Sequence, residues 1–185
     1  PMLSEKYSIR SFAGISKNPT IDLHFDAEKV VQDVDCVLIS HTHPDHFDSK
    51  AVELLRKNID IFCQPANESE LINNGFTNVT SIENTFTWNG ITFIKTNGKH
   101  GSGPILERMG IVSGFVLKSE NEPTIYWVGD SILCEDVRNT IIKYKPDIII
   151  THSGGAVIPG FNPILMDDKE TLSLFNYSPD AKIIA

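Results

Sequence analysis

Short apolar runs alternate with amphipathic stretches along the whole chain, and turn residues separate them. Continuous apolar runs of four to eight residues are typical of buried strands, whereas apolar positions three or four residues apart favour helices. Strands are predicted at 36–40, 59–63, 79–82, 114–117, 124–128, 147–150 and 181–185. Helices are expected from Asp48 or Ser49, before Gly75 and over 135–145. This order suits an α/β (α+β) protein with two sheets and helices outside them.

Two hairpins stand out in this pattern. Asn89-Gly90 divides the run 85–96, and this dipeptide is the strongest short-range hairpin signal. Residues 121–123 join the runs 114–117 and 124–128 in the same way. In the helix predicted over 135–145, the spacing places Val137, Ile141 and Ile142 on one apolar face.

Four metal-binding residue types stand together directly after the first buried strand: His41, His43, Asp45 and His46. Imidazole nitrogens and carboxylate oxygens are ligands that zinc and similar divalent ions accept. A lone histidine is more often a hydrogen-bonded core or surface residue, but three histidines and an aspartate within six residues favour a metal site. Structural zinc sites favour paired cysteines instead, and Cys36, Cys63 and Cys134 are scattered singly, as buried apolar residues are.

The spacing of these ligands predicts two metal positions. Side chains alternate along extended backbone, so His41 and His43 point the same way, and Pro44 keeps His43 extended. Asp45 and His46 then turn over the end of the strand, before the helix that Asp48 or Ser49 caps. Two pairs of ligands aimed at two adjacent points indicate a binuclear site rather than a closed structural one.

His41-Thr42-His43-Pro44-Asp45-His46 resembles the HxHxDH signature of the metallo-β-lactamase superfamily. The resemblance implies a single four-layer αββα sandwich domain over 1–185, with a third histidine at His100 and a bridging aspartate at Asp130. It implies that His41, His43 and His100 hold one metal ion, and that Asp45 and His46 hold another. Without the first motif, His100 would read as a solvated loop histidine and Asp130 as a helix cap.

The resemblance also implies the chemistry. Two divalent ions, zinc first with manganese or iron as alternatives, share a water and lower its pKa toward about 7. The bridging hydroxide attacks a carbonyl or phosphoryl centre, with Asp45 and Asp130 as the catalytic carboxylates. A lactone or other small ester is the expected substrate. The alternatives are a phosphodiesterase or nuclease of the same fold, a flavodiiron-type redox protein, which needs further carboxylates and a flavin domain, or a metal-binding domain without catalysis.

Other candidate residues lie in the loops. His152 follows the predicted strand 147–150, where contact with substrate, support of a ligand and direct ligation are all open. Residues 101–110 are expected to form a flexible pocket wall, in which Arg108 either grips a carboxylate or phosphate or is merely solvated. Residues 153–163 form a second rim segment, whose backbone N–H groups could stabilise an oxyanion. No motif surrounds His24.

The composition of the chain limits the classes of partner and substrate that are expected. With 185 residues, 41% of them hydrophobic, the chain can bury one substantial core. A net charge of −8 argues against nucleic acid, and no run approaches a membrane span, so a small-molecule substrate is expected. Cysteines without a paired spacing and the lack of a signal peptide favour the cytoplasm. The superfamily has N-terminal strands and a late histidine that are missing here, so a chain truncated at both ends is expected. The oligomeric state stays open.

Overall fold

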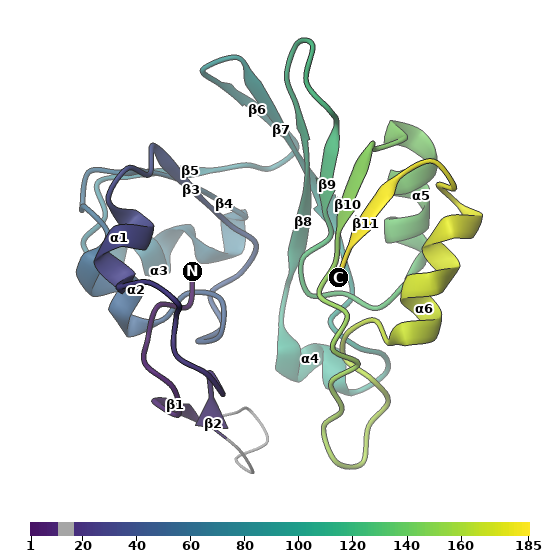
Figure 1. The fold of residues 1–185 in the computed structure, drawn as a ribbon, viewed down its shortest axis with the longest axis horizontal. Coiled ribbons are helices and arrows are strands. Elements are labelled where there is room, and N and C mark those ends of the chain that lie inside the picture. Colours follow the sequence, from purple (N-terminus) through teal and green to yellow (C-terminus); the bar gives the residue numbers. More distant parts are fainter. Residues whose placement is uncertain (11–16) are drawn as a thin grey trace. The chain divides into compact units, whose positions relative to one another are not determined.

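The computed structural model describes residues 1–10 and 17–185, which form two compact units, Pro1–Ser81 and Ile82–Ala185. Figure 1 shows that each unit has its own sheet and its own helices. We call them the N-terminal unit and the C-terminal unit. Among the described residues, no helix is long and apolar enough to cross a membrane.

The N-terminal unit is built on a three-stranded parallel sheet in the order β3-β4-β5. Parallel neighbours need crossover connections, and helices supply them here. A two-stranded antiparallel ribbon, β1-β2, lies earlier in the chain. The strands expected at 36–40, 59–63 and 79–82 are confirmed to within a residue. The elements are β1 (Ile9–Arg10), β2 (Lys17–Asn18), α1 (Ala27–Val31), β3 (Cys36–Ile39), α2 (Ser49–Leu54), β4 (Asp60–Cys63), η1 (Pro65–Asn67), α3 (Glu68–Asn73) and β5 (Asn78–Ser81).

The central strand of this sheet, β4, is buried on both faces. Ile61 and Cys63 belong to the apolar core that also takes in Ala51 of α2 and Leu71 of α3. Phe62 faces the other way along the strand and is equally buried. A parallel strand between two others shows this nearly continuous apolar pattern because both of its faces are covered.

Cys63 should be chemically inert in the native protein. Burial raises the pKa of its thiol to about 12, so almost no reactive thiolate exists near neutrality. We expect iodoacetamide at pH 8 to alkylate Cys63 at least about a hundredfold more slowly in the folded than in the urea-unfolded chain. Cys36, which is only half-buried, is the internal reference in peptide mass spectrometry. Equal rates in both states would show that β4 is not buried.

The C-terminal unit contains a six-stranded sheet in the order β11-β10-β9-β8-β7-β6. Strands β6 to β9 are antiparallel, whereas β9, β10 and β11 are parallel. Helices α5 and α6 lie together on one side of this sheet (Figure 1), where Val137 and Ile141 of α5 and Leu174, just after α6, join its core. The elements are β6 (Thr85–Trp88), β7 (Ile91–Asn97), α4 (Ile105–Met109), β8 (Ser113–Lys118), β9 (Ile125–Trp127), α5 (Glu135–Tyr144), β10 (Ile148–Ile150), α6 (Asp168–Ser173), η2 (Leu174–Asn176) and β11 (Lys182–Ile184).

Both predicted hairpins are confirmed, and one helix face needs correction. Asn89 and Gly90 have φ of +46° and +80°, as the tight turn between β6 and β7 requires. In α5, Val137 and Ile141 are fully buried, but Ile142 is 56% exposed, so its expected place on the buried face was wrong. One residue further along a helix turns the side chain by about 100°, which carries Ile142 away from the sheet.

The stretch 101–110 was expected to be a flexible loop, and this was wrong. It contains α4, whose Ile105 and Met109 pack against Ile158 and Ile164 in a small core of their own. Gly101 begins this stretch with φ of +110°, and an added Cβ would lie only 2.7 Å from a methyl group of Ile105. The two rim segments predicted from the sequence are therefore packed together.

Candidate metal centre

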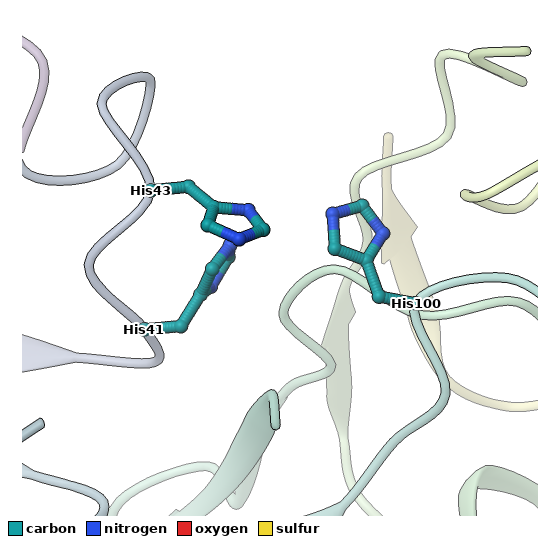
Figure 2. A group of neighbouring side chains, drawn as sticks. All are labelled: His41, His43 and His100. Atoms are coloured by element: carbon teal, nitrogen blue, oxygen red, sulfur yellow. The ribbon is translucent and has the colours of Figure 1, made fainter. Parts of the chain in front are cut away.

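The predicted ligands of the N-terminal unit lie in the turn that follows β3. His41 is 2% exposed, and its ring contacts those of His43 and His46 with centroids 4.4 and 4.2 Å away. Figure 2 shows the rings of His41 and His43 side by side. The turn closes because the backbone N–H groups of His46 and Phe47 donate to the carbonyl of His43. Three imidazoles are thus brought together by six residues of chain.

Asp45 lies at the outer edge of this turn. Its side chain is 48% exposed, and its Oδ2 is 3.9 Å from Nε2 of His46. The sequence placed Asp45 and His46 as a second ligand pair. In the structure His46 leans back onto His41, while Asp45 stays at the surface of the turn. Asp45 is therefore the most accessible carboxylate among the predicted ligands.

A polar network holds the turn in place. The Thr42 hydroxyl, between the two histidines, donates to Glu70 of α3 and accepts from the Asn67 amide at 2.7 Å. The buried Gln64 side chain in turn donates to Asn67. On the other side, the Ser40 hydroxyl lies 3.0 Å from Nδ1 of His41. The sequence did not predict this network, because its members form no motif. Asn67 and Glu70 lie 25 and 28 residues beyond Thr42 in the chain.

Asp48 anchors the far end of the turn. Its Oδ1 accepts the Ala51 N–H and caps α2, which confirms one of the two predicted caps. Its Oδ2 accepts the N–H groups of Leu3 and Ser4, each at 2.7 Å. The carboxylate is 3% exposed, so these three bonds replace nearly all of its hydration. The contact with the first residues of the chain was not foreseen.

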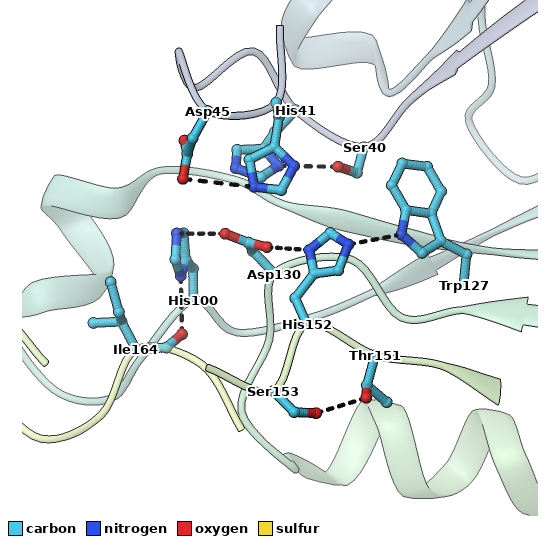
Figure 3. Close-up of polar contacts among 11 residues, drawn as sticks. Ser40, His41, Asp45, His100, Trp127, Asp130, Thr151, His152, Ser153 and Ile164 are labelled. Atoms are coloured by element: carbon cyan, nitrogen blue, oxygen red, sulfur yellow. Dashed lines mark hydrogen bonds and ion pairs between the residues drawn. The ribbon is translucent and has the colours of Figure 1, made fainter. Parts of the chain in front are cut away.

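In the C-terminal unit, His100 and Asp130 face one another. Nδ1 of His100 lies 2.9 Å from the Ile164 carbonyl, which can only accept, so Nδ1 carries the proton. In the neutral ring Nε2 then presents its lone pair, and it lies 3.3 Å from Oδ2 of Asp130 (Figure 3). Both side chains are almost wholly buried. A carbonyl partner on the remote nitrogen is the usual support of a metal-binding histidine.

This donor pair fits a metal ion. A neutral imidazole nitrogen and a carboxylate oxygen both offer lone pairs, and a divalent cation between them would compensate both groups in this buried place. With metal–ligand bonds of about 2.0 Å in tetrahedral geometry, neighbouring ligand atoms are about 3.3 Å apart. The observed separation of 3.3 Å matches that value. The three imidazoles of the N-terminal unit are the same class of ligand.

His152 contacts Asp130 directly. Its Nδ1 is 2.5 Å from Oδ1 of Asp130, and the indole N–H of Trp127 reaches its Nε2 at 3.2 Å (Figure 3). Of the roles open to His152 from the sequence, support of a predicted ligand is the one that these contacts describe. Trp127 was not singled out in the sequence, although it stands three residues before Asp130.

Arg108 and His24 were also considered in the sequence. Arg108 on α4 places its guanidinium 5.9 Å from the ring centroid of Phe161, in a cation–π contact. This contact ties Arg108 to the second rim segment. His24 is exposed in the N-terminal unit, in keeping with the absence of any motif around it.

Comparison with known proteins gives the family. The profile of the beta-lactamase superfamily domain matches residues 13–184. The UPF0173 protein YddR of Bacillus subtilis (strain 168) is 32% identical over 191 residues, which cover 100% of this chain and 75% of YddR. A UPF0173 metal-dependent hydrolase of Koribacter versatilis (strain Ellin345) is 29% identical, over 70% of this chain and 58% of its own length. The chain therefore belongs to the beta-lactamase superfamily.

Solved structures agree with this assignment. A possible metal-dependent hydrolase from Veillonella parvula DSM 2008 has a TM-score of 0.94 at 32% identity, over 99% of this chain and 74% of its own. An isothiocyanate hydrolase from Delia radicum gut bacteria has a TM-score of 0.90 at 30% identity, with the same coverage. The metallo-β-lactamase fold predicted from the sequence is thereby confirmed.

Proposed function

We propose that this metallo-β-lactamase-fold hydrolase binds two divalent metal ions, zinc first, with manganese or iron as alternatives. His41, His43 and His100 would hold one ion, Asp45 and His46 would hold the other, and Asp130 would be a ligand to both. The buried pair of His100 and Asp130, with Nε2 and Oδ2 3.3 Å apart, is the observation that carries this proposal. Because the family profile runs across both units, we propose that residues 1–185 form a single domain.

Each of these residues has its own role in the proposed hydrolysis. Bound metal ions lower the pKa of water and polarise the oxygen that gathers charge in the substrate. Nδ1 of His100 keeps its proton and donates it to the Ile164 carbonyl, which keeps Nε2 directed at the metal site. Asp45, half-exposed on its turn, is the carboxylate that can orient the attacking water and accept its proton. Asp130 would supply one negative charge that offsets part of the charge of the two cations.

The substrate that we propose is a small molecule with an electrophilic carbon, such as a lactone or another small ester. The structural likeness to an isothiocyanate hydrolase favours a second candidate, the isothiocyanate group, whose central carbon is also attacked by water. A nucleic-acid substrate is disfavoured because the chain carries a net charge of −8. Its three free cysteines suit a reducing compartment, and we place the reaction in the cytoplasm.

A substrate panel tests this proposal. The purified chain is stripped with a chelator, reloaded with zinc, manganese or ferrous iron, and offered a lactone, an isothiocyanate and a chromogenic phosphodiester. We expect metal-dependent hydrolysis of a carbon electrophile and none by the stripped protein. Turnover of the phosphodiester alone would assign the chain to the phosphodiesterase alternative. Stoichiometric metal binding without any turnover would leave a binding domain and contradict the proposed catalysis.

A further inference from the structure

Strands β9 and β10 bring three functional side chains to one edge of the six-stranded sheet. The two strands are parallel, and their register pairs Trp127 with Ile150. Asp130 follows Trp127 by three residues and His152 follows Ile150 by two. Side chains that leave adjacent parallel strands at their carboxyl ends lie close together, which accounts for the contact between His152 and Asp130.

Trp127 is itself held firmly. Its neighbour Tyr126 points into the core covered by the helices, so Trp127 lies on the opposite face of the sheet. There it pairs across strands with Phe115, with ring centroids 6.3 Å apart and an angle of 25° between planes. An aromatic pair of this kind fixes the indole plane and thus the direction of its N–H.

The hydrogen bonds determine which nitrogen of His152 carries the proton. An indole N–H can only donate, so Nε2 of His152 accepts from Trp127 with its lone pair. In the neutral ring the proton is then on Nδ1, which donates to Oδ1 of Asp130 at 2.5 Å. The chain of donors runs in one direction, from indole to imidazole to carboxylate. A ring with its proton on Nε2 would break both bonds.

We propose that Trp127 and His152 are positioning residues, which orient the Asp130 carboxylate toward the metal site. By holding Oδ1, His152 fixes the rotation of the carboxylate and leaves Oδ2 directed at Nε2 of His100. This inference rests on the proposed function, because the orientation of the Asp130 carboxylate matters only where that carboxylate binds metal. Partners of this kind typically affect metal affinity by about 10- to 100-fold.

Direct ligation by His152 is the competing role. Each of its ring nitrogens already has a partner, Asp130 on Nδ1 and Trp127 on Nε2. Ligation through Nδ1 would displace the carboxylate, and ligation through Nε2 would displace the indole N–H. Positioning needs neither change, and therefore the contacts favour it.

Three variants of the full chain separate these roles. His152→Asn keeps an N–H donor near the position of Nδ1, whereas His152→Gln places its amide one bond further out and loses that donor. Trp127→Phe keeps the ring but removes the N–H that selects the tautomer. His24→Ala, an exposed histidine in the other unit, is the matched control. The readouts are the zinc dissociation constant, from competition with a chromophoric chelator, and the visible spectrum of the cobalt(II) form.

We expect His152→Gln to weaken zinc binding by about 10- to 100-fold and to alter the cobalt spectrum. The zinc affinity of His152→Asn should stay within about threefold of the parent's. The zinc affinity of Trp127→Phe should fall by about 3- to 10-fold, which corresponds to the loss of one hydrogen bond. If zinc affinity and the cobalt spectrum are unchanged in His152→Gln, the positioning role is wrong although the proposed metal centre stands. If His152→Asn loses as much as His152→Gln, His152 acts as a ligand. A parent chain that binds no zinc would refute the metal centre itself.

Discussion

Replacing His41 with Ala or Asp130 with Asn is expected to abolish metal loading and hydrolysis. His41 lies buried at the middle of the three imidazoles, so its removal takes away the ring that both others contact. Asp130→Asn keeps the shape of the side chain but removes the charge that faces His100. Loss of a ligand should exceed the about 10- to 100-fold effect typical of groups that only orient ligands. Metal content by plasma mass spectrometry and turnover of the substrate found in the panel are the measurements.

The control for this pair is again His24→Ala, because it removes one histidine from an exposed site without a motif. Its metal content and turnover should match those of the parent. Circular dichroism and thermal midpoints establish that each variant is folded. Parent-like metal content and turnover in both His41→Ala and Asp130→Asn would refute the ligand assignment.

Asp48→Ala is expected to lower the free energy of unfolding by about 3 kcal/mol. The cap on α2 contributes about 1 kcal/mol, and each bond from the carboxylate to the N–H of Leu3 or Ser4 adds a charge-assisted contribution of a similar size or larger. The variant also leaves buried N–H groups without their acceptor. Urea unfolding followed by circular dichroism measures the change.

Asp48→Ser separates the two roles of this carboxylate. A serine hydroxyl is a good N-cap but has no second oxygen for Leu3 and Ser4. It should recover about 1 kcal/mol relative to Asp48→Ala and no more. If both variants unfold like the parent, the carboxylate neither caps α2 nor holds the first residues of the chain.

Local patterns in the sequence were sufficient for much of the fold. Asn89-Gly90 specifies its turn because both residues tolerate positive φ, and the apolar runs around it are long enough to define their strands. The cluster from His41 to His46 was visible for the same reason, since its spacing is encoded within six residues. Asp48 was recognisable as a cap because it precedes an apolar helix face.

Contacts between distant segments were not predictable in the same way. The bond from Trp127 to His152 depends on the register of two parallel strands, and no local periodicity encodes that register. Thr42 meets Asn67 and Glu70 for a similar reason, because the fold and not the spacing brings them together. The helix α4 was missed because glycines and a proline around it resemble a loop, and its stability comes from packing against Ile158 and Ile164.

The metal content of the purified chain after dialysis against zinc, manganese or ferrous iron tests the central claim most directly. Plasma mass spectrometry, with protein quantified by amino-acid analysis, gives the number of metal ions per chain. The proposed centre predicts two equivalents of at least one of these metals, and a single equivalent would leave the second metal position without support. Less than one equivalent of every metal in the replete protein would contradict it.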